Sequence, residues 1–544
     1  MTLAKKAYGW LDAVVFDLVR ELRWSFLPPL MVYFAAGIQG LTAIVGTFFV
    51  KEYLGLSAAF LAGLTFWAGL PWALKMPMGH LVDIIWRWKW MLVWVGAGLI
   101  ATSMIIMVLL ISDPDMMETI APIPAWYVTS VILAPSGYVV QDAVADAMSV
   151  EAVPRFDENG EPLDEERARE LHTTMQMLGR VAIITGGVGV SLLNIYMFSG
   201  VESLTQPEKA EVYADIYLLA LAIPVISVSG VILAALQKRL AARRLRQRGA
   251  DANEIALLFE RPGEPTEPNQ WYFIGGGAFV ALSLAVGLSG IPFSQEIVFA
   301  GSFTIIVFLM RQLVQVLPPE KGSALIGTAV IIFVFRAVPL PGPGATWFSI
   351  DELGFDQQFL SVLSLIASVL TLVGMFVLRP LMATRPLTFI VIVLTVAGGI
   401  MLLPNIGLYY GLHEITAPMT AGVVDARFIA IIDTAIESPL GQIAMIPMLA
   451  WIARNAPANL KATFFAVMAS FMNLALSASS LATKYLNQIF TITREVRDRD
   501  SGQIMTPADY SELGMLLVTV LTITVAAPLL AIIVVQKSPL KTPD

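Results

Sequence analysis

The sequence predicts an all-α polytopic membrane protein, and three observations lead to this fold class. Hydrophobic residues make up 57% of the 544 residues and charged residues only 14%, against roughly a quarter in a soluble domain. Nearly chargeless runs of about 20 residues recur along the chain, each long enough to cross a bilayer. Because lipid offers the backbone no hydrogen-bond partners, and a β-barrel would show shorter alternating segments, these runs are expected to be helices.

The apolar runs predict about fourteen membrane-spanning helices. Six lie in the first part of the chain, at about 27–50, 57–79, 90–112, 124–150, 171–198 and 212–236. Two more follow at about 271–290 and 294–317, and a further six at about 323–342, 357–379, 387–405, 424–451, 460–488 and 511–536. A basic stretch and then an acidic, proline-containing segment separate the sixth run from the seventh, and no bilayer would accept them.

A short internal repeat relates the two groups of six runs. VKEYLGLSAAFLAGL follows the first run and SIDELGFDQQFLSVL follows the ninth, so that residues 54–56 and 60–61 match residues 353–355 and 359–360 at a constant offset. This repeat is typical of a major facilitator fold, with two six-helix halves and about two extra helices inserted between them. The expected domains are a cytoplasmic amphipathic lead-in (1–26), an N-terminal half (27–236), a cytoplasmic linker (237–270), an inserted pair (271–317), a C-terminal half (323–536) and a cytoplasmic tail (537–544).

The distribution of Lys and Arg predicts the orientation. The loops that carry most of these residues lie on one side of the membrane if both termini are cytoplasmic, and the loops DPDMMETIAPIPA and PNIGLYYGLHEITAP on the other side contain none. One segment dissents: TREVRDRDSG would face outward with Arg494, Arg497 and Arg499, and its interleaved acidic residues lead us to interpret it as a mixed-charge surface. We expect a multi-pass protein of the inner (plasma) membrane.

Several classes of function are disfavoured. The chain contains no Cys, which removes disulfides and thiolate metal sites. It has no Walker motif, metal-ligand cluster or nucleophile elbow, and its glycine-rich GGGAF lies inside an apolar run rather than between a strand and a helix. We therefore expect no enzyme activity, no cofactor, no metal site and no nucleic-acid partner.

Charged and polar side chains inside the apolar runs are the candidate functional residues, because a charge near the centre of a membrane helix costs roughly 2.5 to 3.5 kcal/mol. Asp142 and Asp146 lie four residues apart in the fourth run, hence on one helix face, and Asp433 and Glu437 repeat this spacing in the twelfth. A carboxylate at such a place could carry a proton. The expected proton-coupling residues are therefore Asp142, Asp146, Asp433 and Glu437.

Cations and amides in other runs could attract an anion to a central cavity between the halves. Arg336 lies in the ninth run, where three prolines interrupt the helix. The expected substrate-binding residues are Gln39, Lys75, Arg180, Arg336 and Asn473. For Lys75, Asp142 and Asp146, which lie toward helix ends, a purely structural ion pair is an equal alternative.

Longer motifs resemble a known family. LPWALKMPMGHLVDIIWRWKW looks like the major facilitator loop motif, in which a tight turn at Gly79 and a pairing of Asp83 with basic residues such as Arg87 latch one conformation. FAAGIQG, KEYLGLS, VQDAVADAMSVEA, FRAVPLPGPGATWFSIDELGF and IPMLAWIARNAPANLKATFFAVMASFMNLALS resemble the folate-biopterin transporter family. The sequence departs from that family at Met76 and Lys461 and in the inserted helix pair.

The resemblance implies a gradient-driven secondary transporter of a pterin, a folate or a similar anionic aromatic metabolite. Its expected partners are that small molecule, a proton or other coupling ion moving by symport, and the lipid bilayer. Two alternatives stay open. One is an exporter of amphiphiles or drugs of the fourteen-helix type, and the other is a non-transporting pigment carrier or assembly factor of the same superfamily.

Overall fold

The computed structural model of the chain describes Arg20, residues 22–54, 56–154 and 164–247, Gly249, and residues 270–287, 291–315, 317–377, 386–441, 461–497 and 504–541. Most of the expected lead-in (1–26) and of the expected linker (237–270) lies outside these residues. Helix α12 (Ala222–Gln247) continues without a break through the first part of that linker. The expected end of the sixth span at residue 236 therefore falls inside a helix.

The N-terminal half consists of helices, two of which are broken near mid-length. The chain runs in the order η2 (Trp24–Phe26), α3 (Leu27–Gly37), η3 (Ile38–Thr42), α4 (Ala43–Tyr53), α5 (Ala58–Gly69), η4 (Leu70–Leu74), α6 (Lys75–Ile84), η5 (Trp86–Trp88), α7 (Trp90–Ser112), α8 (Pro114–Ile120), α9 (Ile123–Ala152), α10 (Glu165–Met197), η6 (Val201–Ser203), α11 (Gln206–Ala220) and α12. Local signals fix several starts: the Ser57 hydroxyl accepts a hydrogen bond from the Phe60 amide, and Thr205 with Glu208 forms a capping box. The first two expected spans are thus each an α-helix, a 3₁₀ segment and a second α-helix.

The inserted pair and the C-terminal half follow. They comprise α14 (Gln270–Gly287), α15 (Ser294–Val314), α16 (Pro319–Arg336), α17 (Pro343–Asp351), α18 (Gln357–Val377), α20 (Leu387–Tyr409), α21 (Leu412–Met419), α22 (Ala426–Gly441), α24 (Lys461–Ile489), β1 (Val496–Arg497), β2 (Ile504–Thr506) and α25 (Leu513–Gln536). The ninth expected span ends at Arg336 rather than at residue 342. Proline at 339, 341 and 343 explains this, because proline lacks the amide donor that a continuing helix needs.

A helix lies over each of the fourteen expected spans, and nine helical segments among the described residues are long and apolar enough to cross a membrane. The other five spans correspond to shorter, interrupted or more polar helices, such as the broken α5–η4–α6 and the short α14. The helix order is therefore the expected one: six spans, an inserted pair of helices and six further spans.

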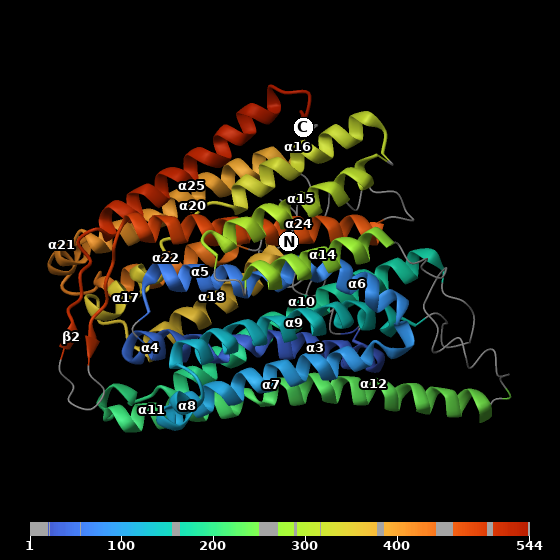
Figure 1. Ribbon diagram of the computed structural model, residues 1–544, viewed down its shortest axis with the longest axis horizontal. Helices are drawn as coiled ribbons and strands as arrows, with labels where there is room; N and C mark the ends of the chain where they lie inside the picture. Colours follow the sequence, from blue (N-terminus) through green and yellow to red (C-terminus); the bar gives the residue numbers. More distant parts are fainter. Residues whose placement is uncertain are drawn as a thin grey trace, which may run out of the picture.

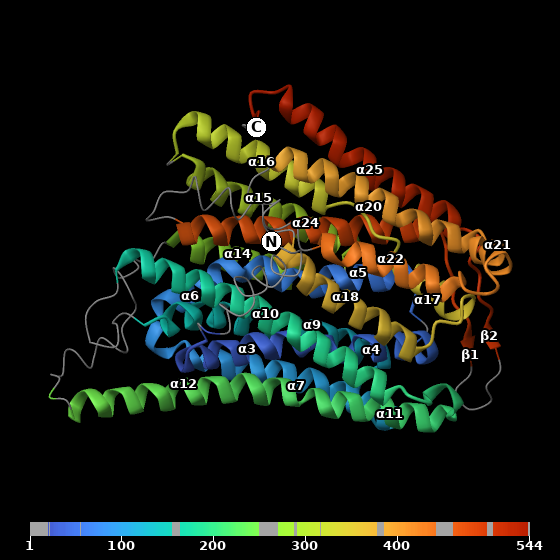
Figure 2. The ribbon, with the colours of Figure 1, turned by 180° about the vertical axis from the view of Figure 1, so that it is seen from behind.

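The helices run roughly parallel to one axis, which gives the bundle two ends (Figure 1). We call the end with α8, α11, α21 and the β1–β2 hairpin the hairpin end, and the end at which α12 and α25 finish the terminal end; Figure 2 shows both from behind. Across the halves, α5 packs on α24 and α10 packs on α18. The hairpin pairs Val496 with Thr506 and lies against α4 of the other half.

The inserted pair packs against both halves. α14 contacts α6, and α15 contacts α5 and α24, and one apolar core contains Phe66 of α5, Val298 of α15, Leu325 of α16 and Phe471 of α24. At the start of α15, the Gln295 amide donates to the Gly63 carbonyl, and the neighbouring Glu296 forms an ion pair with Lys484 at 3.0 Å. The insertion therefore covers the seam between α5 and α24.

The orientation is a prediction that labelling can test. Ser199 lies in an exposed turn at the hairpin end, and Gln247 is exposed at the end of α12. Because the chain has no native cysteine, Ser199→Cys and Gln247→Cys introduce single thiols. We expect a membrane-impermeant maleimide added to intact cells to modify the cysteine at 199 and to spare the one at 247. Modification of the second alone would reverse the orientation.

Candidate functional site

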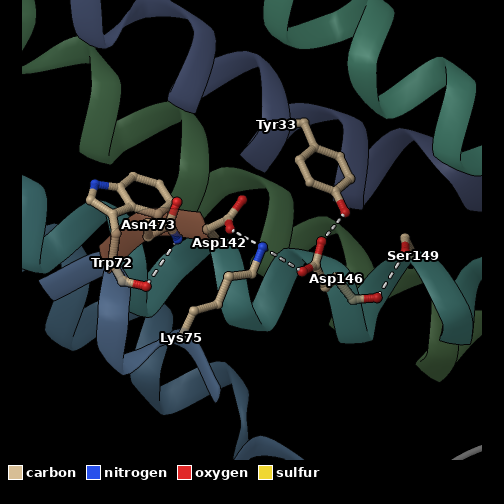
Figure 3. Close-up of polar contacts among 7 residues, drawn as sticks. All are labelled: Tyr33, Trp72, Lys75, Asp142, Asp146, Ser149 and Asn473. Carbon is tan, nitrogen blue, oxygen red and sulfur yellow. Dashed lines mark hydrogen bonds and ion pairs between the residues drawn. The ribbon is translucent and has the colours of Figure 1, made fainter. Parts of the chain in front are cut away.

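A charged cluster joins the first, second and fourth spans of the N-terminal half. Lys75 begins α6, and its Nζ lies 2.6 Å from Oδ2 of Asp142 and 3.0 Å from Oδ2 of Asp146 on α9 (Figure 3). The Tyr33 hydroxyl on α3 donates to Oδ1 of Asp146 at 2.8 Å. The i, i+4 spacing places both carboxylates on one face of α9, as the sequence predicts. Tyr33, by contrast, gave no signal in the sequence, since tyrosines are common in apolar helices.

The charges in this cluster do not balance within themselves. One ammonium group faces two carboxylates, and Arg180 on α10 lies close enough to Asp142 to add a second attractive positive charge. The side chain of Arg180 is exposed, and it forms no ion pair within 4 Å among the described residues. An exposed arginine at membrane depth is stable only beside water or a partner. The cluster therefore combines a triad that has one excess negative charge with a nearby exposed cation, Arg180.

The two predicted amides have different surroundings. Asn473 on α24 donates from Nδ2 to the Trp72 carbonyl at 3.1 Å, and this carbonyl belongs to the 3₁₀ segment η4 just before Lys75. The bond ties the C-terminal half to the N-terminal half beside the charged cluster (Figure 3). Gln39 lies in the 3₁₀ segment η3 and is exposed. An uncharged amide at this place in a membrane span can still donate and accept hydrogen bonds.

Arg336 is the last residue of α16, directly before the break in the ninth span. Its Nε is buried without a hydrogen-bond partner, and the side chain makes no ion pair with any residue that the structure describes. The break itself is well satisfied by α24: the Ser479 hydroxyl donates to the Val338 carbonyl at 2.6 Å, and the Thr483 hydroxyl accepts from the Leu340 amide at 2.9 Å. Within the described part of the chain, the protein thus stabilises the unwound backbone and leaves the guanidinium beside it without an ionic partner.

The twelfth span contributes a second buried carboxylate. Asp433 on α22 is only 9% exposed, and its Oδ2 accepts a hydrogen bond from Nδ2 of Asn405 on α20 at 2.9 Å. The side chain of Glu437 lies outside the described residues. The Asn405 amide can serve either form of this carboxyl group, because it offers a donor to the ionised form and an acceptor to the protonated one.

The expected turn at Gly79 is wrong. Gly79 lies inside α6 without a positive φ, and the chain turns later, between Ile85 and Lys89. Arg87 in this turn is exposed, and the side chain of Asp83 lies outside the described residues. Lys89 is 5% exposed and pairs with Glu151 of α9 at 2.9 Å. One basic residue of this turn, Lys89, is thus already neutralised by Glu151 of α9.

A cavity of about 480 Å³ lies toward the hairpin end, between the N-terminal half and the start of α17. Its walls include hydroxyl-bearing, aromatic and thioether side chains, among them Thr42, Thr47, Thr65, Ser103, Met104, Met107, Tyr127, Ser130, Tyr217, Thr346 and Trp347. The described residues that line it include no Asp, Glu, Lys, Arg or His, and none of the five expected substrate-binding residues. Sequence reasoning missed these residues because hydroxyls and aromatic rings in apolar spans are usual and carry no distinctive spacing.

An ion pair and a hydrogen bond from an arginine join the two halves at the hairpin end. Lys51 at the end of α4 forms an ion pair with Asp351 at the end of α17, and the Tyr510 hydroxyl donates to the same carboxylate. Arg494 donates from Nη1 to the Leu56 carbonyl at 2.7 Å. Each of the contacts from Lys51 and Arg494 joins one half to the other.

Arg494 corrects the interpretation of TREVRDRDSG as a mixed-charge surface. The residue is 3% exposed, and its guanidinium lies 5.1 Å from the ring centroid of Trp347, which lines the cavity. Burial lowers the pKa of Arg494 to about 10, while the nearby Tyr510 and Asp351 act in the opposite direction. The group is therefore still charged at neutral pH.

These contacts predict the effect of removing one charge. Asp351→Asn leaves Lys51, which is 9% exposed, without its ionic partner. We expect a cysteine introduced at Thr65 in the cavity wall to react about tenfold faster with a reagent added from the hairpin end, a change that a bias of about 1.4 kcal/mol between two conformations produces. Asp356→Asn is the control, because Asp356 pairs with Arg427 within one half. Equal rates in all three backgrounds would show that the ion pair does not hold this end closed.

Comparison with known proteins supports the fold and identifies the family. The sequence pattern of the BT1 family matches residues 36–541. A folate-biopterin transporter of Synechocystis sp. (strain ATCC 27184 / PCC 6803 / Kazusa) is 32% identical over 161 residues, which cover 29% of this chain and 31% of the relative. The match thus spans about a third of that relative's length.

Solved structures share the fold at low sequence identity. A POT family transporter in complex with 5-aminolevulinic acid superimposes with a TM-score of 0.61 at 13% identity, covering 95% of this chain and 96% of that one. A mutant of the nucleoside transporter NupG gives a TM-score of 0.51 at 10% identity, covering 94% and 98%. The family match over most of the sequence and the folate-biopterin transporter relative agree with the expectation that the protein is not an enzyme, and this chain belongs to the BT1 family.

Proposed function

We propose that the protein is a gradient-driven secondary transporter of a pterin, a folate or a similar anionic aromatic metabolite, working by rocking of the two halves. It would lie in the inner (plasma) membrane with both termini in the cytoplasm. The family match and the folate-biopterin transporter relative support this proposal. The single observation that carries it is the guanidinium of Arg336 beside the break in the ninth span, which has no ionic partner among the described residues.

Arg336 is partly exposed, and its Nε is buried without a hydrogen-bond partner. A charge without an ionic partner inside a helix bundle costs free energy, and replacing it by a neutral residue would be neutral or stabilising if the bundle had no use for it. Its neighbours satisfy the backbone of the break, so the charge is not needed there. An anionic substrate that pairs with Arg336 accounts for its presence. Arg180 and Gln39, both exposed, are the further groups that we assign to the binding of the anionic substrate.

We assign Lys75 and Asn473 a role other than the direct substrate binding that the sequence predicts. Lys75 already faces two carboxylates, and the amide nitrogen of Asn473 bonds to a backbone carbonyl. We propose that both shape the site, and that substrate competes for Lys75 when Asp142 or Asp146 is protonated. Asp83 and Arg87, near Gly79, are retained as a proposed conformational latch outside the substrate site.

Coupling to protons is assigned to the buried carboxylates. Asp433, held by Asn405, and Glu437 on the same helix are the proposed proton sites of the C-terminal half. In the N-terminal half, Asp142 and Asp146 share a single lysine, so protonation of one carboxylate leaves a balanced pair. Symport then follows if substrate binding and protonation favour the same conformation.

Proteoliposomes test this proposal. Purified protein should accumulate radiolabelled folate or biopterin only when a pH gradient is imposed, and Asp433→Asn should flatten the pH dependence of the initial rate. Asp425→Asn serves as the control, because Asp425 caps the start of α22 through the Phe428 amide at the hairpin end. Accumulation without any gradient would refute gradient-driven transport. An unchanged pH profile in Asp433→Asn would exclude this carboxylate as a coupling site.

The exporter alternative would be favoured by a cavity lined mainly with Phe and Met. The observed cavity contains Met104 and Met107, but hydroxyl-bearing side chains are more numerous in its wall. This composition supports a ligand that forms hydrogen bonds rather than a purely hydrophobic one.

A further inference from the structure

We propose that the cavity at the hairpin end binds an uncharged, planar heteroaromatic ring through an edge that both donates and accepts hydrogen bonds. We call it the hydroxyl cavity. It lies apart from the charged residues that the proposed function uses for the anionic group. The inference deepens that function by dividing recognition into two places, and it rests on the proposed function only for the identity of the ring.

The size and the electrostatics of the hydroxyl cavity restrict its ligand. Its volume of about 480 Å³ is within the range of small-molecule sites, about 300 to 1,000 Å³. The described residues of its wall carry no charged side chain. A carboxylate moved into this wall would lose its hydration without gaining a counter-ion, at a cost of several kcal/mol. The part of a ligand that fits here is therefore uncharged.

The hydroxyl groups define the hydrogen-bonding edge of that ligand. Thr65 Oγ1 donates to the Leu61 carbonyl at 3.0 Å and Thr47 Oγ1 donates to the Ala43 carbonyl at 3.0 Å, so the proton of each is already in use. Each oxygen keeps lone pairs and can still accept. The two threonines therefore present acceptors to the cavity.

Tyr127 supplies the complementary group. Its hydroxyl forms no hydrogen bond with any residue that the structure describes, and Tyr127 lines the cavity together with Ser130. Ser130 is engaged with Ser103 at 2.9 Å. A ring that offers both an N–H donor and a carbonyl or ring-nitrogen acceptor would satisfy the threonines and Tyr127 together. A purely hydrocarbon ring would leave all three without ligand hydrogen bonds.

Aromatic and thioether groups complete the wall. Trp347 at the start of the C-terminal half lines the cavity together with Met104 and Met107 of α7. Flat rings gain from contact with tryptophan and with polarisable sulfur. Trp347 also contacts the guanidinium of Arg494, which lies 5.1 Å from its ring centroid. Occupancy of the cavity is therefore in position to affect the closure of the hairpin end.

The hydroxyl cavity and the charged cluster are built on the same helix. Ala134 of α9 lines the cavity, and Asp142 lies eight residues further along. At 1.5 Å per residue, these positions are about 12 Å apart along the helix. A ligand with an uncharged ring at one end and an anionic group at the other can therefore reach both places.

Cysteine protection tests the inference on the full chain. Thr65 is exposed to the cavity, and Thr65→Cys places a single thiol there because the native chain has none. Biopterin, lumazine or hypoxanthine, each an uncharged fused ring with donor and acceptor atoms, should slow its alkylation at least about fivefold. Naphthalene-2-methanol, which has a similar size but no ring donor or acceptor, should not. Ser203→Cys, in an exposed turn, is the control whose alkylation should not change.

A second variant measures affinity. Tyr127→Phe should weaken binding of a protecting ring about five- to tenfold, the usual effect of one lost hydrogen bond. Tyr196→Phe is the matched control, since Tyr196 is 77% exposed on α10 and does not line the cavity. If Thr65→Cys is unprotected by all three rings and Tyr127→Phe binds as wild type, the inference is wrong even if the protein transports pterins. If the rings protect but no transport is observed, the cavity assignment stands and the proposed function fails.

Discussion

Arg336→Gln should abolish uptake of an anionic substrate while the protein still inserts and folds. Loss of one charged contact to the substrate costs about 2 kcal/mol or more, which lowers the initial rate at least about thirtyfold. Stability should be unchanged or slightly higher, because Nε of Arg336 is buried and unbonded, and the guanidinium has no ionic partner among the described residues. The measurements are initial uptake in proteoliposomes and thermal unfolding of the purified variant.

Arg311→Gln is the matched control for this variant. Arg311 is exposed in the last turn of α15, at the end of the helix that we expect to be cytoplasmic. It does not line the cavity. It should transport as wild type. Normal uptake by Arg336→Gln would refute the anion-binding role, and failure to recover the variant folded would instead assign Arg336 to a structural interaction.

The sequence predicted those features that cost free energy in a membrane helix, namely charged side chains and prolines. A charge in an apolar run is conspicuous because lipid penalises it, so Asp142, Asp146 and Lys75 were identified without a structure. Their pairing follows from the four-residue spacing on α9 and the opposite sign of the lysine. The break after Arg336 followed from three prolines, whose backbone cannot continue a helix.

Other parts of the site gave no distinctive signal in the sequence. The neutral residues of the hydroxyl cavity, such as Thr65 and Tyr127, are ordinary in membrane helices, and only their convergence from several spans makes a cavity. Arg494 was assigned to a surface because its neighbours in the chain are acidic. Its actual partner, the Leu56 carbonyl, is 438 residues away in the sequence. Contacts of this kind depend on how the halves meet, which local patterns do not encode.

Removing Lys75 should have the largest effect on stability of any substitution in the charged cluster. Lys75→Met leaves Asp142 and Asp146 on one face of α9 without their ammonium partner. A fully buried charge deprived of its partner costs about 3 to 5 kcal/mol, and we expect a smaller loss here because the Asp146 side chain is 45% exposed. The purified variant should unfold at a clearly lower temperature than wild type. Lys321→Met, at an exposed position in the first turn of α16, should unfold as wild type.

Combining Lys75→Met with Asp142→Asn and Asp146→Asn separates structure from function in the same cluster. All three charges are then absent, so the unfolding temperature should return close to that of wild type, because a neutral polar triad carries no unpaired ion. Proton coupling should not return with it, since neither carboxylate can be protonated. Wild-type pH dependence of uptake in the triple variant would make the triad a purely structural ion pair. Restored stability with a flattened pH profile would assign a proton site to α9, because Asp142→Asn and Asp146→Asn remove both the unpaired charges and the groups that can be protonated.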